Sequence, residues 1–186
     1  MITFDQEQTC DSVEIEALHC AAFGPDKSKK SAFMLRENAS HLMEYSCVAR
    51  AEGLVLATVR FTAVHVKDTL FDGTSNALLL GPLTVLASMR GSGLGSSLAE
   101  YALAGVRAEG HKRILLIGDV AYYGRFGFEP VKPRYISMPG GRDAGRLLVK
   151  QSADMPPLPL FGQVYPHWAD QDDHYMQPAQ GLHTAA

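Results

Sequence analysis

Hydrophobic and polar positions change period along the chain, and the changes mark the expected elements. Near the N-terminus, Ile15, Leu18 and Ala22 recur every three or four residues, which predicts a helix that begins at Asp11 or Ser12 and runs to Phe23. Gly24-Pro25 ends this helix. We expect a short strand over residues 1–4 before it and a second helix over residues 31–43 after it.

The period then shortens to that of strands. Residues 46–51 and 54–66 are rich in Val, Thr, Ala and Phe, and Glu52-Gly53 between them predicts a tight turn, so the pair should form a hairpin. Residues 68–76 are expected to be a loop. Residues 77–85 are nearly all apolar, as in a buried strand, and the internal Gly81-Pro82 predicts a bulge because proline cannot donate to a sheet.

A glycine-rich turn follows, Arg90-Gly91-Ser92-Gly93-Leu94-Gly95, then a predicted helix over residues 96–109, a strand over residues 113–117 and a short helix over residues 120–126. Strand, helix and strand in this order predict a right-handed crossover between parallel strands. Together with the antiparallel hairpin, this predicts a mixed α/β (α+β) sheet with flanking helices. Strands are also expected over residues 135–138 and 146–150, and an irregular Pro-rich stretch over residues 156–166.

Composition narrows the class of protein. The chain has 186 residues, of which 46% are hydrophobic and 20% charged, with a formal net charge of −3. This fits one globular domain, expected over residues 1–170, and a polar, frayed tail over residues 171–186. No basic field favours a nucleic acid or a membrane surface, and no apolar run approaches the ~20 residues of a membrane span. Without a secretory signal at the N-terminus, we expect a cytoplasmic protein.

Metal and disulfide sites are not expected. The three cysteines, Cys10, Cys20 and Cys47, lack CxxC spacing, and their odd number argues against a disulfide framework. The seven histidines form no HxH or HExxH pair.

The glycine-rich turn is the main chemical signal. Glycines at alternate positions let backbone N–H groups approach an anion where a helix begins, and Arg90 adds a full charge, which predicts a phosphate or diphosphate site. A flexible turn with close helix packing is the plain alternative. A dinucleotide site would need G-x-G-x-x-G, but Ser96 stands at the last position, although Asp119 follows the next strand. The lysine of a Walker motif is missing.

Two segments together resemble the GNAT family of N-acetyltransferases. Arg90, Gly93 and Gly95 fill the fixed positions of its acyl-CoA-binding motif Q/R-x-x-G-x-G/A, after the strand end Gly81-Pro82-Leu83-Thr84-Val85. Further along, Ala121-Tyr122-Tyr123-Gly124-Arg125-Phe126-Gly127-Phe128 is similar to the family's second motif. The segment Gly162-Gln163-Val164-Tyr165-Pro166 resembles a bacterial branch of small, mostly uncharacterised members. One departure is Ala87, where many members have proline.

The resemblance implies the acyl-CoA N-acyltransferase fold: a mostly antiparallel sheet whose central parallel strands splay apart. It implies acetyl-CoA as co-substrate, without a metal, and transfer of the acetyl group to a primary amine of a small molecule or peptide by direct attack in a ternary complex. Pantetheine would bind the edge of the strand as an added strand does, and the diphosphate would bind the glycine-rich turn. Tyr123 would be the general acid, and Tyr122 would have a packing role. The expected co-substrate contacts are Leu83, Thr84 (its side chain facing away), Val85, Arg90, Gly91, Ser92, Gly93, Leu94, Gly95 and Ser96.

Other parts of the predicted site stay open. Glu44, His65 and Asp119 are candidate general bases, and a chain of water molecules to bulk solvent is the alternative to them. Asp119 is also expected to cap the helix that carries Tyr123. The family's acceptor site would fall near residues 23–43, 67–76 and 158–168. A homodimer is compatible with the family.

Two other functions compete with the transferase. A CoA-binding sensor or interaction module would keep the same fold without turnover. A nucleotide-dependent oxidoreductase on a Rossmann-like sheet would bind NAD in place of acetyl-CoA.

Overall fold

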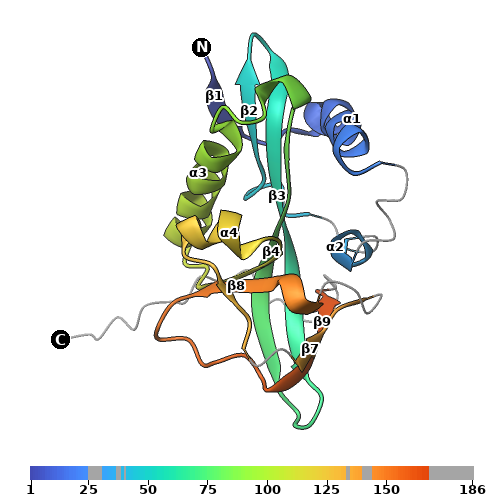
Figure 1. The fold of residues 1–186 in the computed structure, drawn as a ribbon, viewed down its shortest axis with the longest axis vertical. Coiled ribbons are helices and arrows are strands. Elements are labelled where there is room, and N and C mark those ends of the chain that lie inside the picture. Colours follow the sequence, from blue (N-terminus) through green and yellow to red (C-terminus); the bar gives the residue numbers. More distant parts are fainter. Residues whose placement is uncertain (25–30, 37–38, 40, 133–134, 140–143, 168–186) are drawn as a thin grey trace, which may run out of the picture.

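A β-hairpin and a crossover helix organise the fold (Figure 1). The structure is a computed structural model, and it describes residues 1–24, 31–36, 39, 41–132, 135–139 and 144–167. The expected domain limit and tail, like residue 168 at the end of the expected acceptor segment 158–168, lie outside the described residues.

The hairpin joins β2 (Cys47–Ala51) to β3 (Leu54–Asp68). Its turn has the predicted form, because Glu52 and Gly53 both have positive φ angles, of 52° and 82°. β1 (Thr3–Gln6) pairs with β2, and β3 pairs with β4 (Thr74–Val85), all antiparallel. The far end of β3 also pairs antiparallel with β9 (Phe161–Pro166), so three strands use β3 as partner.

The sheet continues beyond β4 through a parallel pair. β4 lies parallel to β5 (Arg113–Ile117), which pairs antiparallel with β8 (Leu147–Gln151). β8 also pairs with β6 (Glu129–Pro130), and β7 (Tyr135–Ser137) lies parallel to β9. The prediction of a mixed, mostly antiparallel sheet with a central parallel pair is confirmed.

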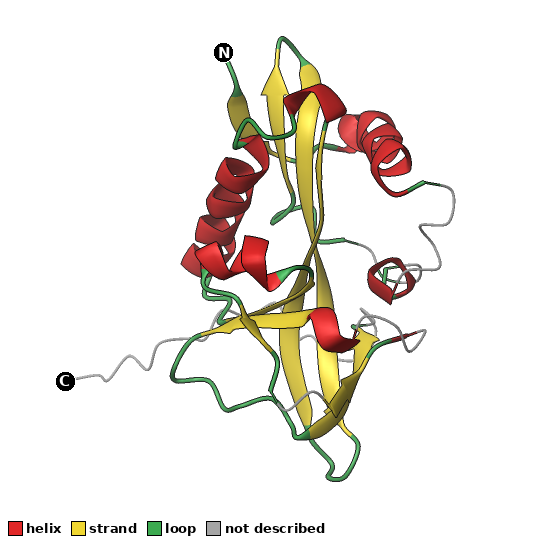
Figure 2. Ribbon diagram, in the orientation of Figure 1, coloured by secondary structure: helices red, strands yellow, loops and turns green. Residues whose placement is uncertain are grey.

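The helices cover both faces of the sheet because β2 and β3 alternate apolar residues between them. On one face α1 (Ser12–Phe23) packs Ile15 and Leu18 against Val48 and Val55. On the other face α3 (Leu94–Ala108) packs against a larger cluster that includes Ala49. Figure 2 shows α1 and α3 on opposite sides of the long strands. α4 (Val120–Tyr123) and the 3₁₀ turn Gly124–Phe126 follow β5, and further 3₁₀ turns span Thr9–Asp11, Ala87–Met89 and Ala144–Arg146.

Three local predictions are wrong. Among the described residues of the helix expected over 31–43, only α2 (Ser31–Met34) is helical. By Leu42 the chain already follows the sheet, since the Leu42 N–H donates to the Phe61 carbonyl at 2.7 Å. The loop expected over residues 68–76 is shorter, because β3 runs to Asp68 and β4 starts at Thr74. The Pro-rich stretch contains a strand, β9. Among the described helices, none has the length and apolar character needed to cross a membrane.

Candidate active site

The parallel strands separate at the centre of the sheet. β4 and β5 pair only at Leu78–Ile114 and Leu79–Leu115. Beyond this point β4 stays paired with β3 as far as Val85, so its edge toward β5 carries no further strand pairing. The predicted bulge is also present: Val59 pairs with Leu83 and Phe61 with Leu80, so Gly81-Pro82 bulges out opposite one residue of β3.

A cavity of about 350 Å³ opens in this gap. We call it the strand-gap cavity. Its walls come from β4, from the end of β5, from α4 and from the α1–α2 region, and they consist of Phe23, Phe33, Arg36, Leu80, Gly81, Pro82, Leu83, Ile117, Gly118, Asp119, Tyr122, Tyr123 and Arg146. Open backbone and aromatic side chains therefore face each other across one space.

Tyr123 is held by the end of β5. A Cβ atom on Gly118 would lie 2.4 Å and 2.6 Å from two carbons of the Tyr123 ring, so the ring occupies the space that any side chain at Gly118 would need. Burial, with a smaller contribution from the Tyr122 phenol, raises the pKa of Tyr123 to about 12. The phenol is therefore protonated at neutral pH and can act as a proton donor.

Asp119 caps the helix that carries Tyr123. Its Oδ1 accepts a hydrogen bond from the Ala121 N–H at 3.0 Å, as expected for an N-cap. Among the three candidate bases, Asp119 is the one that lines the strand-gap cavity. Glu44 lines a separate hollow beside α3, and His65 stacks on Tyr165 at a ring distance of 5.6 Å, on the β3–β9 pair.

The glycine-rich turn leads into α3. Gly91 and Gly93 have φ angles of +80° and +86°, which favour glycine, and Gly93 is the N-cap. The first helical bond runs from the Ser97 N–H to the Gly93 carbonyl, at 3.0 Å. The N–H groups of Gly95 and Ser96 precede it and have no intrahelical acceptor.

A smaller cavity of about 270 Å³ lies at this turn. We call it the turn cavity, and it is lined by Val85, Met89, Arg90, Gly91, Gly93, Leu94, Gly95, Ser96, Tyr122 and Arg125. Gly95 has no room for a side chain, because a Cβ atom there would lie 2.9 Å from Cγ2 of Val85. Free N–H groups, the helix dipole and two arginines make this cavity suited to an anion.

Tyr122 packs against the core cluster, as expected from the sequence, and it also lines both cavities, which the sequence did not indicate. Its hydroxyl lies 3.2 Å from Ser96 Oγ, and the Arg125 guanidinium stacks over its ring at 4.7 Å. The chain offers no local sign of this role beyond the position next to Tyr123.

The predicted co-substrate contacts are distributed over both cavities. Leu83 lines the strand-gap cavity and Val85 the turn cavity, whereas Thr84 lines neither and is buried, as expected from the alternation of a strand. The Leu94 side chain is buried in the core beneath α3. Arg90 Nε donates to the Val85 carbonyl at 3.4 Å, and Ser92 Oγ to the Met89 carbonyl at 2.7 Å.

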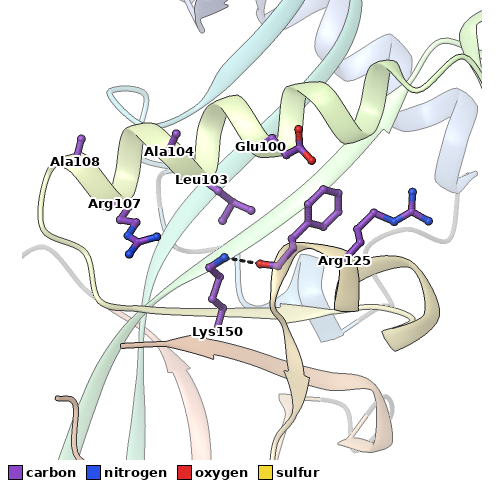
Figure 3. Close-up of a pocket in the computed structure, with 8 residues that line it drawn as sticks. Glu100, Leu103, Ala104, Arg107, Ala108, Arg125 and Lys150 are labelled. Atoms are coloured by element: carbon purple, nitrogen blue, oxygen red, sulfur yellow. Dashed lines mark hydrogen bonds between the residues drawn. The ribbon is translucent and has the colours of Figure 1, made fainter. Parts of the chain in front are cut away.

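A third cavity, of about 540 Å³, lies beside α3 (Figure 3). Glu100 and Arg107 project from α3 toward it, and Arg125 and Lys150 line it from the other side, where Lys150 Nζ donates to the Phe126 carbonyl. Arg125 also lines the turn cavity, so the two cavities share one basic side chain.

A splayed parallel strand pair, a helix N-terminus with free N–H groups and a buried phenol are the features that the resemblance to the GNAT family led us to expect. The comparison with known proteins agrees. The sequence model of the Acetyltransferase (GNAT) family matches residues 12–128. The chain therefore belongs to the GNAT family, and the expected family membership and fold are confirmed.

Relatives of known sequence cover most of the chain. It is 27% identical over 176 residues to the uncharacterised N-acetyltransferase YjhQ of Escherichia coli, covering 92% of this chain and 94% of that protein. It is 32% identical over 120 residues to the uncharacterised N-acetyltransferase YhbS of the same species, covering 64% of this chain and 68% of that protein.

Two solved structures are similar over nearly the whole chain. A GNAT family acetyltransferase of Brucella melitensis in complex with acetyl-CoA has a TM-score of 0.63 and 26% identity, covering 90% of this chain and 96% of that one. YhbS of Escherichia coli in complex with CoA has a TM-score of 0.67 and 26% identity, covering 95% of this chain and 92% of that one. Within the described residues of this chain, no three His, Cys, Asp or Glu side chains are grouped so as to hold a metal ion.

Proposed function

We propose that this protein transfers the acetyl group of acetyl-CoA to a primary amine of a small molecule or peptide, by direct attack within a ternary complex. The observation that carries the proposal is the open edge of β4 between Leu80 and Val85, which runs from the strand-gap cavity to the turn cavity. Two solved relatives of the same fold hold acetyl-CoA or CoA.

Three parts of acetyl-CoA would meet surfaces of these cavities. The two amides of pantetheine would pair with the open edge of β4 as an added strand does. The diphosphate would accept hydrogen bonds from the N–H groups of Gly95 and Ser96 at the positive end of α3. Arg125 and Lys150, in the cavity beside α3, would face the phosphate on the ribose.

The reaction then takes place in the strand-gap cavity. The amine nitrogen forms a bond to the thioester carbonyl carbon, and the carbon–sulfur bond breaks. The departing thiolate takes the proton of the Tyr123 hydroxyl, and the proton that the amine loses passes through solvent and restores the phenol. Binding both substrates side by side, with the amine close to the thioester carbon, supplies the rest of the rate enhancement.

Thermal unfolding with acetyl-CoA, dephospho-CoA and NAD tests the donor, and release of free CoA thiol with a panel of amines tests the transfer. Acetyl-CoA at 100 times its dissociation constant should add ~2.7 kcal/mol to the stability. Dephospho-CoA should stabilise less, and NAD should not stabilise. Stabilisation by NAD alone would contradict the proposal, and CoA binding without turnover of any amine would indicate a binding module.

The contact between Gly118 and Tyr123 gives a further prediction. In Gly118→Ala, the new Cβ would collide with the Tyr123 ring and with Cδ1 of Leu116, at 2.8 Å, so the phenol must move. We expect kcat to fall roughly 10- to 100-fold, as for other small displacements of reacting groups. Gly105→Ala on α3, where a Cβ meets nothing within 4 Å, is the matched control and should keep full activity. Equal rates for the two variants would show that the position of Tyr123 does not matter.

A further inference from the structure

The outer wall of the strand-gap cavity is built by residues that the reaction scheme does not use. Phe23 at the end of α1 and Phe33 in α2 pack edge to face, with ring centroids 5.2 Å apart. The Arg36 guanidinium lies over the Phe33 ring at 5.8 Å and reaches the bulge of β4, where a Cβ atom on Gly81 would lie 3.4 Å from its Nη2. Arg36 therefore lies beside the bulge of β4, in the wall of the cavity that Tyr123 also lines.

Arg36 differs from Arg60 and Arg113, two other arginines of the described chain whose side chains are largely buried. Arg60 donates to both carboxylate oxygens of the buried Glu7, at 2.9 Å and 2.6 Å, and His41 contacts the same carboxylate at 3.0 Å. Arg113 donates to Gln151 Oε1 at 3.1 Å and to the Pro156 carbonyl. By contrast, Nε and Nη1 of Arg36 are buried and have no hydrogen-bond partner.

An unpaired buried guanidinium is costly. Burial, and in second place the charge of Arg60, lower the pKa of Arg36 to about 9. The acidic side chain in this cavity, Asp119, already caps α4 and is not bonded to those two nitrogens. A planar anion with two oxygens would satisfy Nε and a terminal nitrogen together, which is the geometry in which arginine binds carboxylates.

We propose that Arg36 is the anion-binding residue of the acceptor site, and that the acceptor is an amino acid whose carboxylate binds Arg36 while its amine points toward Tyr123. The inference rests on the proposed function. A cavity of about 350 Å³ fits a small molecule of this kind. Phe23 and Phe33 would pack against the carbon chain between the two charged ends.

Amines that differ only in the carboxylate test the proposal. We would compare kcat/KM for β-alanine with that for β-alaninamide, and for γ-aminobutyrate with that for butylamine, all with acetyl-CoA. The acid should be preferred by roughly 10- to 100-fold, the range expected for hydrogen bonds to a charged group. In Arg36→Met this ratio should fall to near one. An unchanged ratio in the variant, or no preference in the native protein, would overturn the proposal.

A second acyl donor tests whether Arg36 binds a carboxylate on the acceptor or one on the acyl group. Succinyl-CoA places a carboxylate on the acyl group instead of the acceptor. We expect no gain over acetyl-CoA when butylamine is the acceptor. A preference for succinyl-CoA that Arg36→Met abolishes would assign Arg36 to the donor and overturn the acceptor assignment.

Unfolding temperatures separate a binding role from a structural one. Because Arg36 has buried nitrogens without partners, Arg36→Met should unfold at the same or a higher temperature than the native protein. Arg60→Met is the matched control and should unfold earlier, since it leaves the buried Glu7 without its bidentate partner. Destabilisation of Arg36→Met as large as that of Arg60→Met would make Arg36 a structural residue.

A binding measurement keeps this test independent of turnover. Saturation-transfer NMR would follow β-alanine and β-alaninamide with the protein, with and without CoA. Transfer to β-alanine that Arg36→Met abolishes would support the carboxylate site even if no amine were acetylated. Absence of transfer in both conditions would overturn it, whereas failure of CoA to bind would count against the proposed function alone.

Discussion

Tyr123→Phe should lower kcat by about 100-fold and leave the affinity for acetyl-CoA nearly unchanged, because the variant keeps the buried ring and loses only the proton that the leaving thiolate needs. Steady-state kinetics, together with calorimetric titration of CoA, measures both quantities. Tyr122→Phe is the control: it removes the hydroxyl that contacts Ser96 and should affect CoA binding more than kcat.

The pH dependence of the same reaction is a sharper part of this prediction. Since burial raises the pKa of Tyr123 to about 12, the acid form persists through neutral and moderately alkaline pH. The native kcat should therefore show no loss from this phenol between about pH 7 and pH 10. A Tyr123→Phe variant with native kcat, or a Tyr122→Phe variant with the larger loss, would remove the acid role from Tyr123.

The second large effect is expected at the turn, in Gly93→Glu. Gly93 is the N-cap of α3 at φ +86°, and a Cβ there meets nothing within 4 Å, so the backbone cost is the same for any side chain of similar size. Gly93→Gln is therefore the matched control, and the two variants differ only in charge. A carboxylate ~5 Å from a diphosphate should make acetyl-CoA binding weaker than in Gly93→Gln, by on the order of 100-fold.

Circular dichroism should show both variants of Gly93 folded, and titration with acetyl-CoA then gives the ratio of the two dissociation constants. If the folded Glu and Gln variants bind acetyl-CoA equally well, the diphosphate does not lie at this turn. High salt should narrow the difference, because the added charge is close to solvent.

The parts of the fold that local sequence determines were the easiest to predict. The bounds of α1 and β5, the turn at Glu52-Gly53 and the cap by Asp119 follow from capping residues, apolar spacing and glycine, and all agree with the structure. β9 could not be predicted in the same way. Phe161–Pro166 has little strand character of its own and becomes a strand because β3 offers it an open edge between Val64 and Asp68.

The candidate site shows the same difference between residues in local motifs and residues placed by the fold. The glycine-rich turn and Tyr123 belong to contiguous motifs, so the sequence indicated both. The positions of Tyr122 and Arg36 in the cavity walls could not be predicted, because they depend on contacts with distant segments: Ser96 for the Tyr122 hydroxyl, and the bulge of β4 for the Arg36 guanidinium. The second helix was overextended because the apolar spacing of residues 31–43 does not reveal that Leu42 bonds to the sheet.

The two walls of the strand-gap cavity come from separate parts of the chain. Phe23, Phe33 and Arg36 belong to the α1–α2 region, whereas the rest of this cavity comes mainly from β4, the end of β5 and α4. The proposed diphosphate site lies apart from it, in the turn cavity at the start of α3. Substitutions in the first group can therefore alter which amine is accepted while coenzyme recognition is inherited unchanged. Divergence of selectivity among proteins of this architecture can proceed through a short N-terminal segment, and engineering of a new acceptor range can begin there.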